Sequence, residues 1–174
     1  MRTLRGKMSL RKIMRESASI HPPKREIAFF AQDWDDGFNS GSLFRTADAL
    51  GVVHVYLAGR TPTPEEETVH RTSMGHHRRV AWSQFARWDD AIDRIKSDGW
   101  TMIAVEIADG AVPYFEFAFP ERTCLVLGNE ERGVYSSVMK QCEAAVFIPM
   151  AGKGRSLNVA VSAAIVGFHA RFEA

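Results

Sequence analysis

The sequence predicts an α/β protein in which a parallel sheet is flanked by helices on both faces. Short, continuously apolar segments alternate along the chain with segments whose apolar residues recur at helical spacing, the order typical of parallel sheets. The apolar segments also lack the polar and apolar alternation of a strand with one solvated face. At 174 residues, the chain is long enough for one domain with a substantial core.

The expected elements begin after His21-Pro22-Pro23, because consecutive prolines oppose helix and mark a boundary. Apolar and β-branched runs predict strands at Glu26–Gln32, Val52–Ala58, Arg79–Trp82, Trp100–Ile107, Thr123–Leu127 and Ala144–Ile148. Helical spacing and end signals predict helices at Ser42–Leu50, from Pro64, and at Trp88–Ser97, Ser136–Gln141 and Leu157–Arg171. Ligands of such sheets bind at the carboxyl ends of the strands, so chemistry is expected after Gln32, Leu127 and Ile148.

The small overall charge of +1 hides an asymmetry. Residues 1–25 carry eight Lys or Arg and one acid, Glu16, a net charge of +7 (8 − 1), which leaves −6 (1 − 7) for the remainder. Such a basic arm could bind a phosphate backbone. It could equally be a solvated amphipathic helix, and its Arg and Ser content leaves a transit peptide open. The charge alone does not decide between these interpretations.

Membrane proteins and disulfide-rich secreted proteins do not fit this composition. The apolar stretches Val52–Ala58 and Val159–Phe168 fall short of the roughly 20 apolar residues that cross a bilayer. The two cysteines, Cys124 and Cys142, lie in apolar segments, where a free thiol behaves as a small buried hydrophobe. We therefore expect no membrane span and a reduced, cytoplasmic setting.

The first candidate loop, residues 39–47 (NSGSLFRTA), places Asn39 ahead of a helix and Arg45 about one and a half turns later. Asn39 could be an ordinary N-cap or turn residue. Arg45 interrupts the apolar face between Phe44 and Ala47, and a buried guanidinium needs a partner such as a phosphate or a carboxylate. The loop therefore has one candidate functional side chain beyond ordinary turn chemistry.

Two further candidate loops follow later strands. In residues 125–134 (LVLGNEERGV), Gly128 permits close approach of a ligand and Glu130 can accept hydrogen bonds, although an acidic turn would look the same. Residues 148–159 (IPMAGKGRSLNV) include Ser156 and Asn158, which could cap the last helix. P-loop spacing is absent, and no G-x-G-x-x-G follows the first strand, which disfavours nucleotide hydrolysis and NAD chemistry.

A metal site and an acyl-transfer nucleophile are also disfavoured. His76 and His77 are adjacent and lack the i, i+4 spacing of a helical metal pair. No G-x-S-x-G elbow is present. We expect no metal.

Taken in order, the three loops match N-x-G-x-x-x-R-T-A-x-A-x-G, L-V-x-G-x-E-x-x-G and I-P-M-x-G-x-x-x-S-L-N-V-x-V-x-A. The chain thereby resembles the SpoU/TrmH family of RNA 2'-O-ribose methyltransferases, in the SPOUT superfamily. The resemblance covers residues 27–172, and residues 71–75 (RTSMG) resemble a conserved segment between the family's motifs. We therefore expect a methyltransferase domain over residues 26–174, preceded by the basic arm of residues 1–25.

The resemblance implies S-adenosylmethionine as cofactor, RNA as substrate, a homodimer with shared active sites, and a carboxyl-terminal deep trefoil knot, an exception to the usual absence of knots. The residues that it places around the cofactor are Glu106, Ile107, Leu127, Gly128, Asn129, Ile148, Met150, Ser156 and Leu157. The residues that it assigns to catalysis are Asn39, Arg45, Glu130, Ser156 and Asn158.

In the roles implied by the resemblance, Asn39 orients the first loop, Arg45 holds phosphate or ribose and helps to activate the 2'-hydroxyl, and Glu130 fixes Arg45 or the loop. Ser156 and Asn158 shape the third loop. Arginine is a permanent cation and a poor base, so the acceptor of the hydroxyl proton is not assigned.

The expected substrate is tRNA rather than rRNA, because no extra amino-terminal RNA-binding domain precedes the catalytic region. Ser40 and Ser42 stand where the family usually has small apolar residues. Three alternatives stay open: an rRNA 2'-O-methyltransferase, a methyltransferase acting on a base, and a catalytically silent knotted RNA-binding protein.

Overall fold

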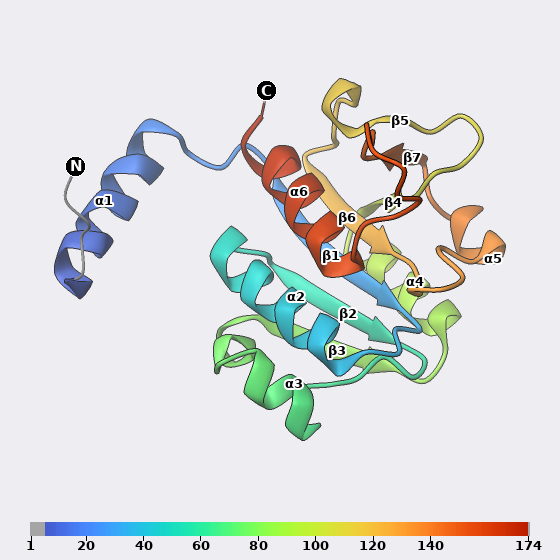
Figure 1. Cartoon of the computed structure of the whole chain (residues 1–174), viewed down its shortest axis with the longest axis horizontal. Helices are drawn as coiled ribbons and strands as arrows, with labels where there is room; N and C mark the ends of the chain where they lie inside the picture. The colour runs from blue at the N-terminus through green and yellow to red at the C-terminus, as the bar shows by residue number, and fades with distance from the viewer. Residues whose placement is uncertain (1–5, 174) are drawn as a thin grey trace.

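The computed structural model describes residues 6–173, so expectations for residues 1–5 and 174 lie outside the described residues. Figure 1 shows a sheet with helices on both sides and one amino-terminal helix apart from them, which confirms the α/β class. The elements are α1 Lys7–Ile20, β1 Glu26–Gln32, α2 Gly37–Leu50, β2 His54–Ala58, α3 Glu67–Thr72, the 3-10 turn η1 His76–Arg79, β3 Ala81–Phe85, α4 Trp88–Ser97, β4 Thr101–Val105, β5 Val112–Pro113, the 3-10 turn η2 Tyr114–Glu116, β6 Arg122–Leu127, α5 Ser136–Met139, β7 Ala144–Phe147 and α6 Val159–Phe172.

Within residues 6–173, the strands form one sheet in the order β3-β2-β1-β6-β4-β7-β5. Every pairing is parallel. β1 and β6, from the two halves of the chain, are neighbours, with Phe29 beside Leu125. The carboxyl ends of all strands therefore lie at one edge of the sheet. The loops predicted to carry chemistry follow β1, β6, β4 and β7 at this edge.

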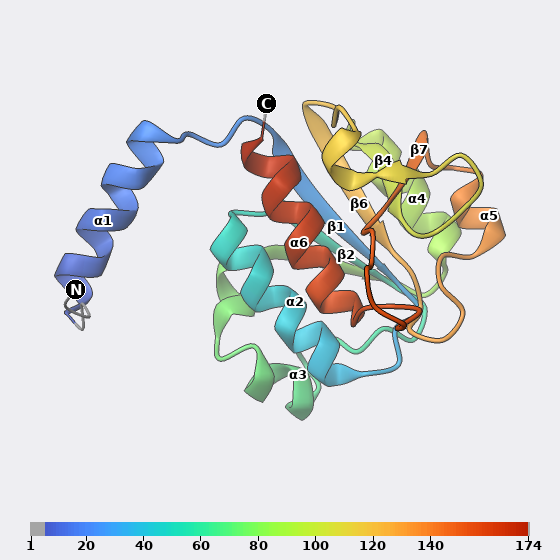
Figure 2. The ribbon, with the colours of Figure 1, turned by 45° about the horizontal axis from the view of Figure 1, so that its top comes forward.

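The strands are apolar throughout because both faces of the sheet are covered. Phe29 points into a cluster with Phe44 of α2 and Val166 of α6. Its neighbour Phe30 points the other way, into a cluster with Ile95 of α4. Figures 1 and 2 show α2 and α6 over one face and α4 behind the sheet. Alternate side chains of one strand thus fill two separate cores.

Several element ends differ from the expected ones for local reasons. α2 begins at Gly37, because the Asp36 carboxylate accepts a hydrogen bond from the Phe38 N–H and caps the helix. Asn39 and Ser40 therefore lie inside the helix and do not form a loop ahead of it. β4 ends at Val105 and β7 at Phe147, so the residues after each strand are already in loops.

Other segments were missed or displaced. β3 occupies Ala81–Phe85 and follows η1, not the expected 79–82. α6 starts at Val159, after the Asn158 cap. β5 and η2 were not predicted, because a two-residue strand and a single 3-10 turn carry no measurable periodicity.

The amino-terminal arm is a helix, α1, that stands apart from the sheet domain (Figures 1 and 2). After α1 the chain is tied to the domain at Arg25, whose Nε donates to the Phe119 carbonyl at 2.7 Å. The Lys24 N–H donates to the Arg171 carbonyl at 2.8 Å. The side chains of residues 8–20 are exposed, apolar and basic ones alike. Among the described residues, no helix is long and apolar enough to cross a membrane.

The two-sided core predicts which substitutions destabilise the fold. Replacing Phe29, which is fully buried between α2 and α6, with Ala should lower the free energy of unfolding by about 3–5 kcal/mol, since the cavity left behind cannot collapse fully. Urea unfolding followed by circular dichroism measures this change. Phe38→Ala is the matched control, because Phe38 is 64% exposed and its loss should change stability by less than about 1 kcal/mol.

Candidate functional site

A cavity of about 460 Å³ lies at the carboxyl ends of β4, β6 and β7. The loops after these strands form its walls, the position that a parallel sheet favours for ligands. A cavity of this size falls within the usual range for small-molecule sites. Its lining includes each residue predicted to contact a cofactor, namely Glu106, Ile107, Leu127, Gly128, Asn129, Ile148, Met150, Ser156 and Leu157.

The loop after β6 forms a tight wall of the cavity. Asn129 and Gly133 exchange two backbone hydrogen bonds, with N to O distances of 3.0 and 2.9 Å. A Cβ on Gly128 would lie 2.2 Å from the Gly133 carbonyl carbon, so only glycine fits there. Gly133 has a φ of +65°, which also favours glycine. The two glycines therefore allow the loop to fold back on itself at the cavity.

The Asn129 side chain holds this loop rather than facing outward. Its Oδ1 accepts hydrogen bonds from the Glu131 and Arg132 N–H groups, both at 3.0 Å. Its Nδ2 donates to the Asp33 carbonyl at 2.6 Å and to Asp35 Oδ2 at 2.9 Å. With 4% exposure, Asn129 is committed to joining the loops after β1 and β6.

Glu106 joins the loop after β4 to the same wall. Its carboxylate accepts hydrogen bonds from the Ile107 N–H at 2.9 Å and from the Val134 N–H at 3.0 Å. A Cβ on Gly133 would lie 2.3 Å from Glu106 Oε2. The carboxylate is therefore packed directly against the glycine turn and fixes the relative position of the two loops.

Three predicted catalytic residues form one hydrogen-bonded network. Asn39 Nδ2 donates to Glu130 Oε1 at 2.8 Å, and Asn158 Nδ2 donates to Asn39 Oδ1 at 2.8 Å. Glu130 Oε2 also accepts from the Asp35 N–H at 3.1 Å. Asn158 Oδ1 caps α6 by accepting from the Ala160 and Val161 N–H groups. The network thus brings together the segments after β1, β6 and β7.

Arg45 is not part of this network. It lies on the exposed side of α2, so the expectation of a guanidinium buried in the apolar face is wrong. Within the described chain, Glu130 accepts hydrogen bonds from the Asn39 side chain and the Asp35 N–H, contacts that hold the loop in place. Ser156 lines the cavity, and the capping that it might have supplied is provided by Asn158 alone.

Other residues of the site were missed in the sequence. Buried Trp34 donates from Nε1 to the Leu127 carbonyl at 3.2 Å and so supports the floor of the loop after β6. The Asp35 carboxylate accepts a hydrogen bond from the Asn129 amide. Arg155 and Glu131 line the cavity. The position of Trp34 and Asp35 directly after the first strand was a usable signal, because the carboxyl ends of parallel strands share one edge.

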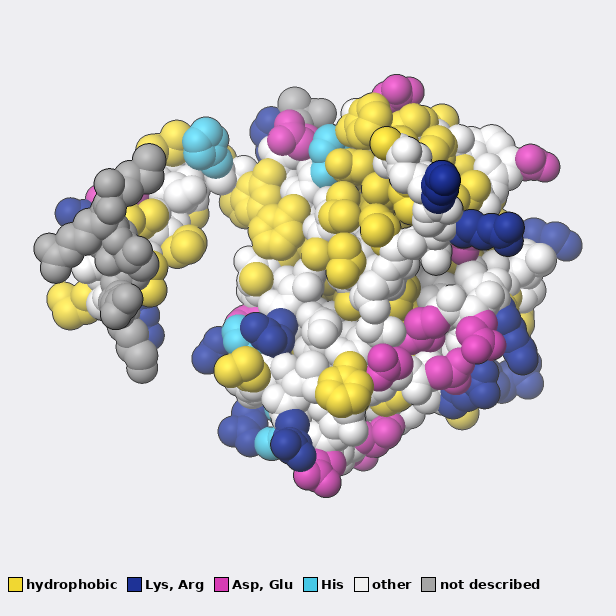
Figure 3. All heavy atoms as spheres, in the orientation of Figure 1, with side chains coloured by type: hydrophobic (Ala, Val, Ile, Leu, Met, Phe, Trp, Pro, Cys, Tyr) yellow, Lys and Arg dark blue, Asp and Glu magenta, His cyan; other side chains and the backbone are white. Residues whose placement is uncertain are grey.

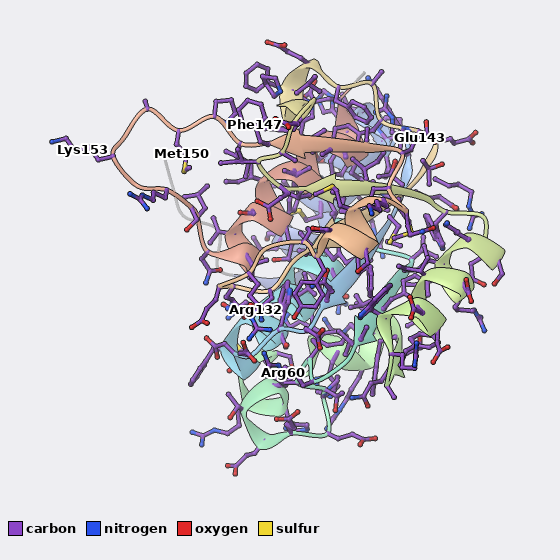
Figure 4. The ribbon with its side chains drawn as sticks, turned by 90° about the vertical axis from the view of Figure 1, so that its right-hand side faces the viewer. Arg60, Arg132, Glu143, Phe147, Met150 and Lys153 are labelled. Carbon is purple, nitrogen blue, oxygen red and sulfur yellow. The ribbon has the colours of Figure 1, made fainter. Side chains whose placement is uncertain are left out.

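The cavity wall is predominantly acidic. Its charged side chains are the carboxylates of Glu106, Glu130 and Glu131 and the guanidinium of Arg155, so the lining favours a ligand that carries positive charge. Figure 4 shows the loop with Met150 and Lys153 projecting away from the body of the protein. Among the described residues, no group of three or more His, Cys, Asp or Glu could hold a metal ion.

The two adjacent histidines have different partners. His76 Nδ1 lies 2.6 Å from Asp48 Oδ2, whereas His77 Nδ1 lies 2.6 Å from the Ser73 hydroxyl. His77 is buried, and its burial lowers the pKa of the imidazole.

The fold and the cavity define the class of protein: a parallel α/β protein with a small-molecule cavity at the carboxyl edge of its sheet, closed by three loops in one hydrogen-bonded network. Residues 26–168 match the SpoU rRNA Methylase family. The chain belongs to this family, and the resemblance inferred from its three motifs is confirmed.

The chain is 29% identical over 160 residues to the 23S rRNA (guanosine(2553)-2'-O)-methyltransferase RlmP of Bacillus subtilis, a match that covers 89% of this chain and 64% of the relative. It is 29% identical to the tRNA (guanosine(18)-2'-O)-methyltransferase of Escherichia coli, covering 76% of this chain and 57% of the relative. Among solved structures, the AdoMet-bound rRNA methyltransferase of Sinorhizobium meliloti superposes with a TM-score of 0.79 at 30% identity, covering 87% and 58% of the two chains. The chain therefore spans less than two thirds of the length of these relatives.

The buried amide of Asn129 offers a direct test of the loop architecture. In Asn129→Asp, the two hydrogen bonds donated by Nδ2 are lost and a second carboxylate faces Asp35. The free energy of unfolding should fall by about 2–4 kcal/mol at neutral pH. Chemical denaturation measures it. Gln141→Glu is the matched control, since Gln141 is exposed and only accepts a hydrogen bond from Lys96; an equal loss in both variants would contradict the role of Asn129.

Proposed function

We propose that this chain is an S-adenosylmethionine-dependent RNA methyltransferase that transfers a methyl group to a ribose 2'-hydroxyl. The observation that carries the proposal is the cavity at the carboxyl edge of the sheet, whose rim holds the network of Asn39, Glu130 and Asn158. Membership of the SpoU rRNA Methylase family supports the same activity, as do relatives named as 2'-O-methyltransferases.

The residues present fit S-adenosylmethionine. The cavity combines apolar walls at Val105, Leu127 and Ile148, suited to an adenine ring, with three carboxylates suited to a cationic group. The cradle at Gly128, which has no room for a Cβ, holds the wall in place beside the ligand. When bound, the cofactor supplies an electrophilic methyl group, so no metal is needed to activate it.

The protein's own contribution to such a transfer is positioning. Such a transfer would require the attacking oxygen to be held in line with the methyl carbon at near-attack distance, and positioning of this kind supplies a large part of the rate enhancement. We assign to Asn39, Glu130 and Asn158 the role of fixing the three loops around the donor, because their hydrogen bonds join those loops. Arg45 is assigned to the phosphate or ribose of the RNA, and Ser156 to shaping the third loop.

We propose a homodimer, and the position of Arg45 supports it. Along α2 it lies six residues from Asn39, about 9 Å of helix rise, and on the exposed side. Arg45 is therefore better placed to reach the cavity of a second copy of the chain than the cavity of its own chain. Exposed apolar side chains, Phe168 at 43% and Val161 at 46%, form part of the apolar surface over α6 that Figure 3 displays, and such surfaces commonly pack against a partner.

The remaining features of the proposal concern the knot, the domains and the setting. The segments after β6 and β7 line one cavity, which supports threading of residues 148–158 through the earlier loop as a deep trefoil knot. We propose residues 1–25 as an RNA-binding arm and residues 26–174 as the catalytic domain. Both cysteines are free, with Cys124 buried, which suits a reduced, cytoplasmic setting.

The favoured substrate is tRNA, because several relatives are named as tRNA (guanosine(18)-2'-O)-methyltransferases. The alternative is rRNA, the substrate in the name of RlmP. Incubating the protein with labelled S-adenosylmethionine and separate tRNA and rRNA fractions tests the activity and the choice together. Alkali-resistant dinucleotides at the labelled position would identify 2'-O-methylribose. Transfer to neither RNA, or label on a base, would overturn the proposal.

Arg45→Ala should lower kcat by at least about two orders of magnitude, the scale of a lost positioning or electrostatic group. Binding of S-adenosylmethionine, measured by calorimetry, should be unchanged because Arg45 lies outside the cavity lining. Phe38→Ala serves as a control on the same helix. Full activity of Arg45→Ala would remove the residue from the mechanism.

Mixing two inactive variants distinguishes a shared site from a site within one protomer. If Arg45→Ala and Asn158→Ala chains exchange freely, half of the dimers are mixed, and each mixed dimer holds one intact site when Arg45 acts on its partner. Turnover should then recover to about a quarter of the wild-type value. Recovery would be absent if Arg45 served its own chain.

Deleting residues 1–20 should weaken RNA binding and flatten its salt dependence, because each lost cation–phosphate contact lowers the slope of log K against log salt by about 0.7–0.9. Fluorescence anisotropy at several salt concentrations measures both quantities. Replacing the exposed Met8 and Met14 of α1 with Gln is the control, since it alters the helix without removing charge. An unchanged slope after the deletion would exclude RNA binding by the arm.

A further inference from the structure

The segment from α3 to η1 carries a concentration of positive charge in a domain whose net charge is negative. Between Glu67 and Arg87 the sequence contains three arginines, three histidines and no acid. Five of these side chains, His70, Arg71, His76, Arg78 and Arg79, form what we call the α3–η1 basic patch. Figure 3 shows Lys or Arg and His side chains gathered where α3 and η1 lie.

The charged groups of the patch are accessible. The side chains of Arg71 and Arg79 are 78% and 67% exposed, and Arg78 is also exposed. Arg79 lies 2.9 Å from Asp48, and Arg71 lies 3.4 Å from Glu67. The Arg71–Glu67 pair is exposed on both sides, and such pairs are weak, so Arg71 can exchange its partner for a phosphate. Asp48 is less exposed and also contacts His76, while the guanidinium of Arg79 keeps an exposed side that a phosphate can reach.

The turn that presents these cations is rigidly built. Gly75 has a φ of +80°, which glycine adopts readily. Met74 has a φ of +50°, and a non-glycine residue keeps such a conformation only where the surroundings enforce it. The buried Ser73 hydroxyl supplies that constraint through the His70 carbonyl at 3.1 Å and His77 Nδ1 at 2.6 Å. Cations held on a fixed turn lose less freedom when they bind a ligand.

The patch lies next to Arg45. α3 packs closely against α2. The approach is so tight that a Cβ on Gly41 would lie 2.5 Å from Thr72 Cβ. Further along α2, Asp48 holds His76 at 2.6 Å and Arg79 at 2.9 Å. Arg45 is three residues before Asp48 and so lies on the same side of the helix. An RNA strand held at Arg45 would therefore reach the patch without bending around the protein.

We propose that the α3–η1 basic patch binds the phosphate backbone of the RNA substrate beside the methylated nucleotide. The inference rests on the proposed RNA methyltransferase function. Backbone phosphates fit the patch because arginine forks match phosphate oxygens. A protein partner fits it less well, since Met74 is the exposed large apolar residue of this segment within the described chain, and protein interfaces depend on an apolar centre.

The double variant Arg78→Gln/Arg79→Gln tests the proposal. In methyl transfer to transcribed tRNA, KM for RNA should rise about tenfold with kcat within about twofold of wild type. In anisotropy titrations with the same tRNA, the slope of log K against log salt should fall by about 1.4–1.8, the loss of two phosphate contacts. S-adenosylmethionine binding should not change.

Arg87→Gln/Lys140→Gln is the matched control, because it removes the same charge from exposed positions on the α4 and α5 side of the sheet. If both double variants behave alike in RNA binding, the patch has no special role and the proposal is overturned, which would favour an acidic protein partner. If wild-type protein binds tRNA but transfers no methyl group, the proposed activity fails, while the salt slopes still decide the role of the patch.

Discussion

The arrangement of this site depends on a single carboxamide. Asn39 accepts a hydrogen bond from Asn158 through Oδ1 and donates one to Glu130 through Nδ2, so one planar group joins three loops that are far apart in sequence. Because an amide carries a donor and an acceptor at a fixed spacing, neither a carboxylate nor a hydroxyl could serve both neighbours in the same way. The helix cap at Asn158 and the loop at Glu130 are thereby placed relative to the start of α2, and the cavity between them takes its shape.

Much of the fold could be predicted because its strands are short apolar runs bounded by turn residues. The bounds of Glu26–Gln32 and Trp88–Ser97 are those of β1 and α4. The start of α2 was missed, since Asp36 lay in a stretch that looked like turn chemistry, and only the geometry of its carboxylate identifies it as the cap. Helix ends are set by such single hydrogen bonds, which hydrophobic spacing does not reveal.

The sequence allowed residues of the cavity lining to be predicted, but not the hydrogen bonds that join them. The resemblance named nine of the residues that line the cavity, yet sequence does not distinguish a side chain that faces the ligand from one that holds the wall. Asn129 belongs to the second kind, with all its polar atoms bound to protein. Arg45 was expected to be buried because it interrupts the apolar face between Phe44 and Ala47. The helix turns about 100° per residue, and that rotation carries Arg45 to the exposed side while Phe44 packs in the core.

The cavity has two walls of different character, and this difference bears on how a ligand would be held. The loop after β6 is fixed by the Asn129 amide, the glycine turn and Glu106, so this wall exists before a ligand arrives. Residues 151–158, on the other side, are all exposed, and Figure 4 shows this loop extending outward at Lys153. A ligand that contacts both walls must order and bury part of the open one, which costs conformational entropy. Affinity for a methyl donor should therefore be set by the fixed wall, and the open wall is where a second molecule, the RNA or a partner protomer, can alter it.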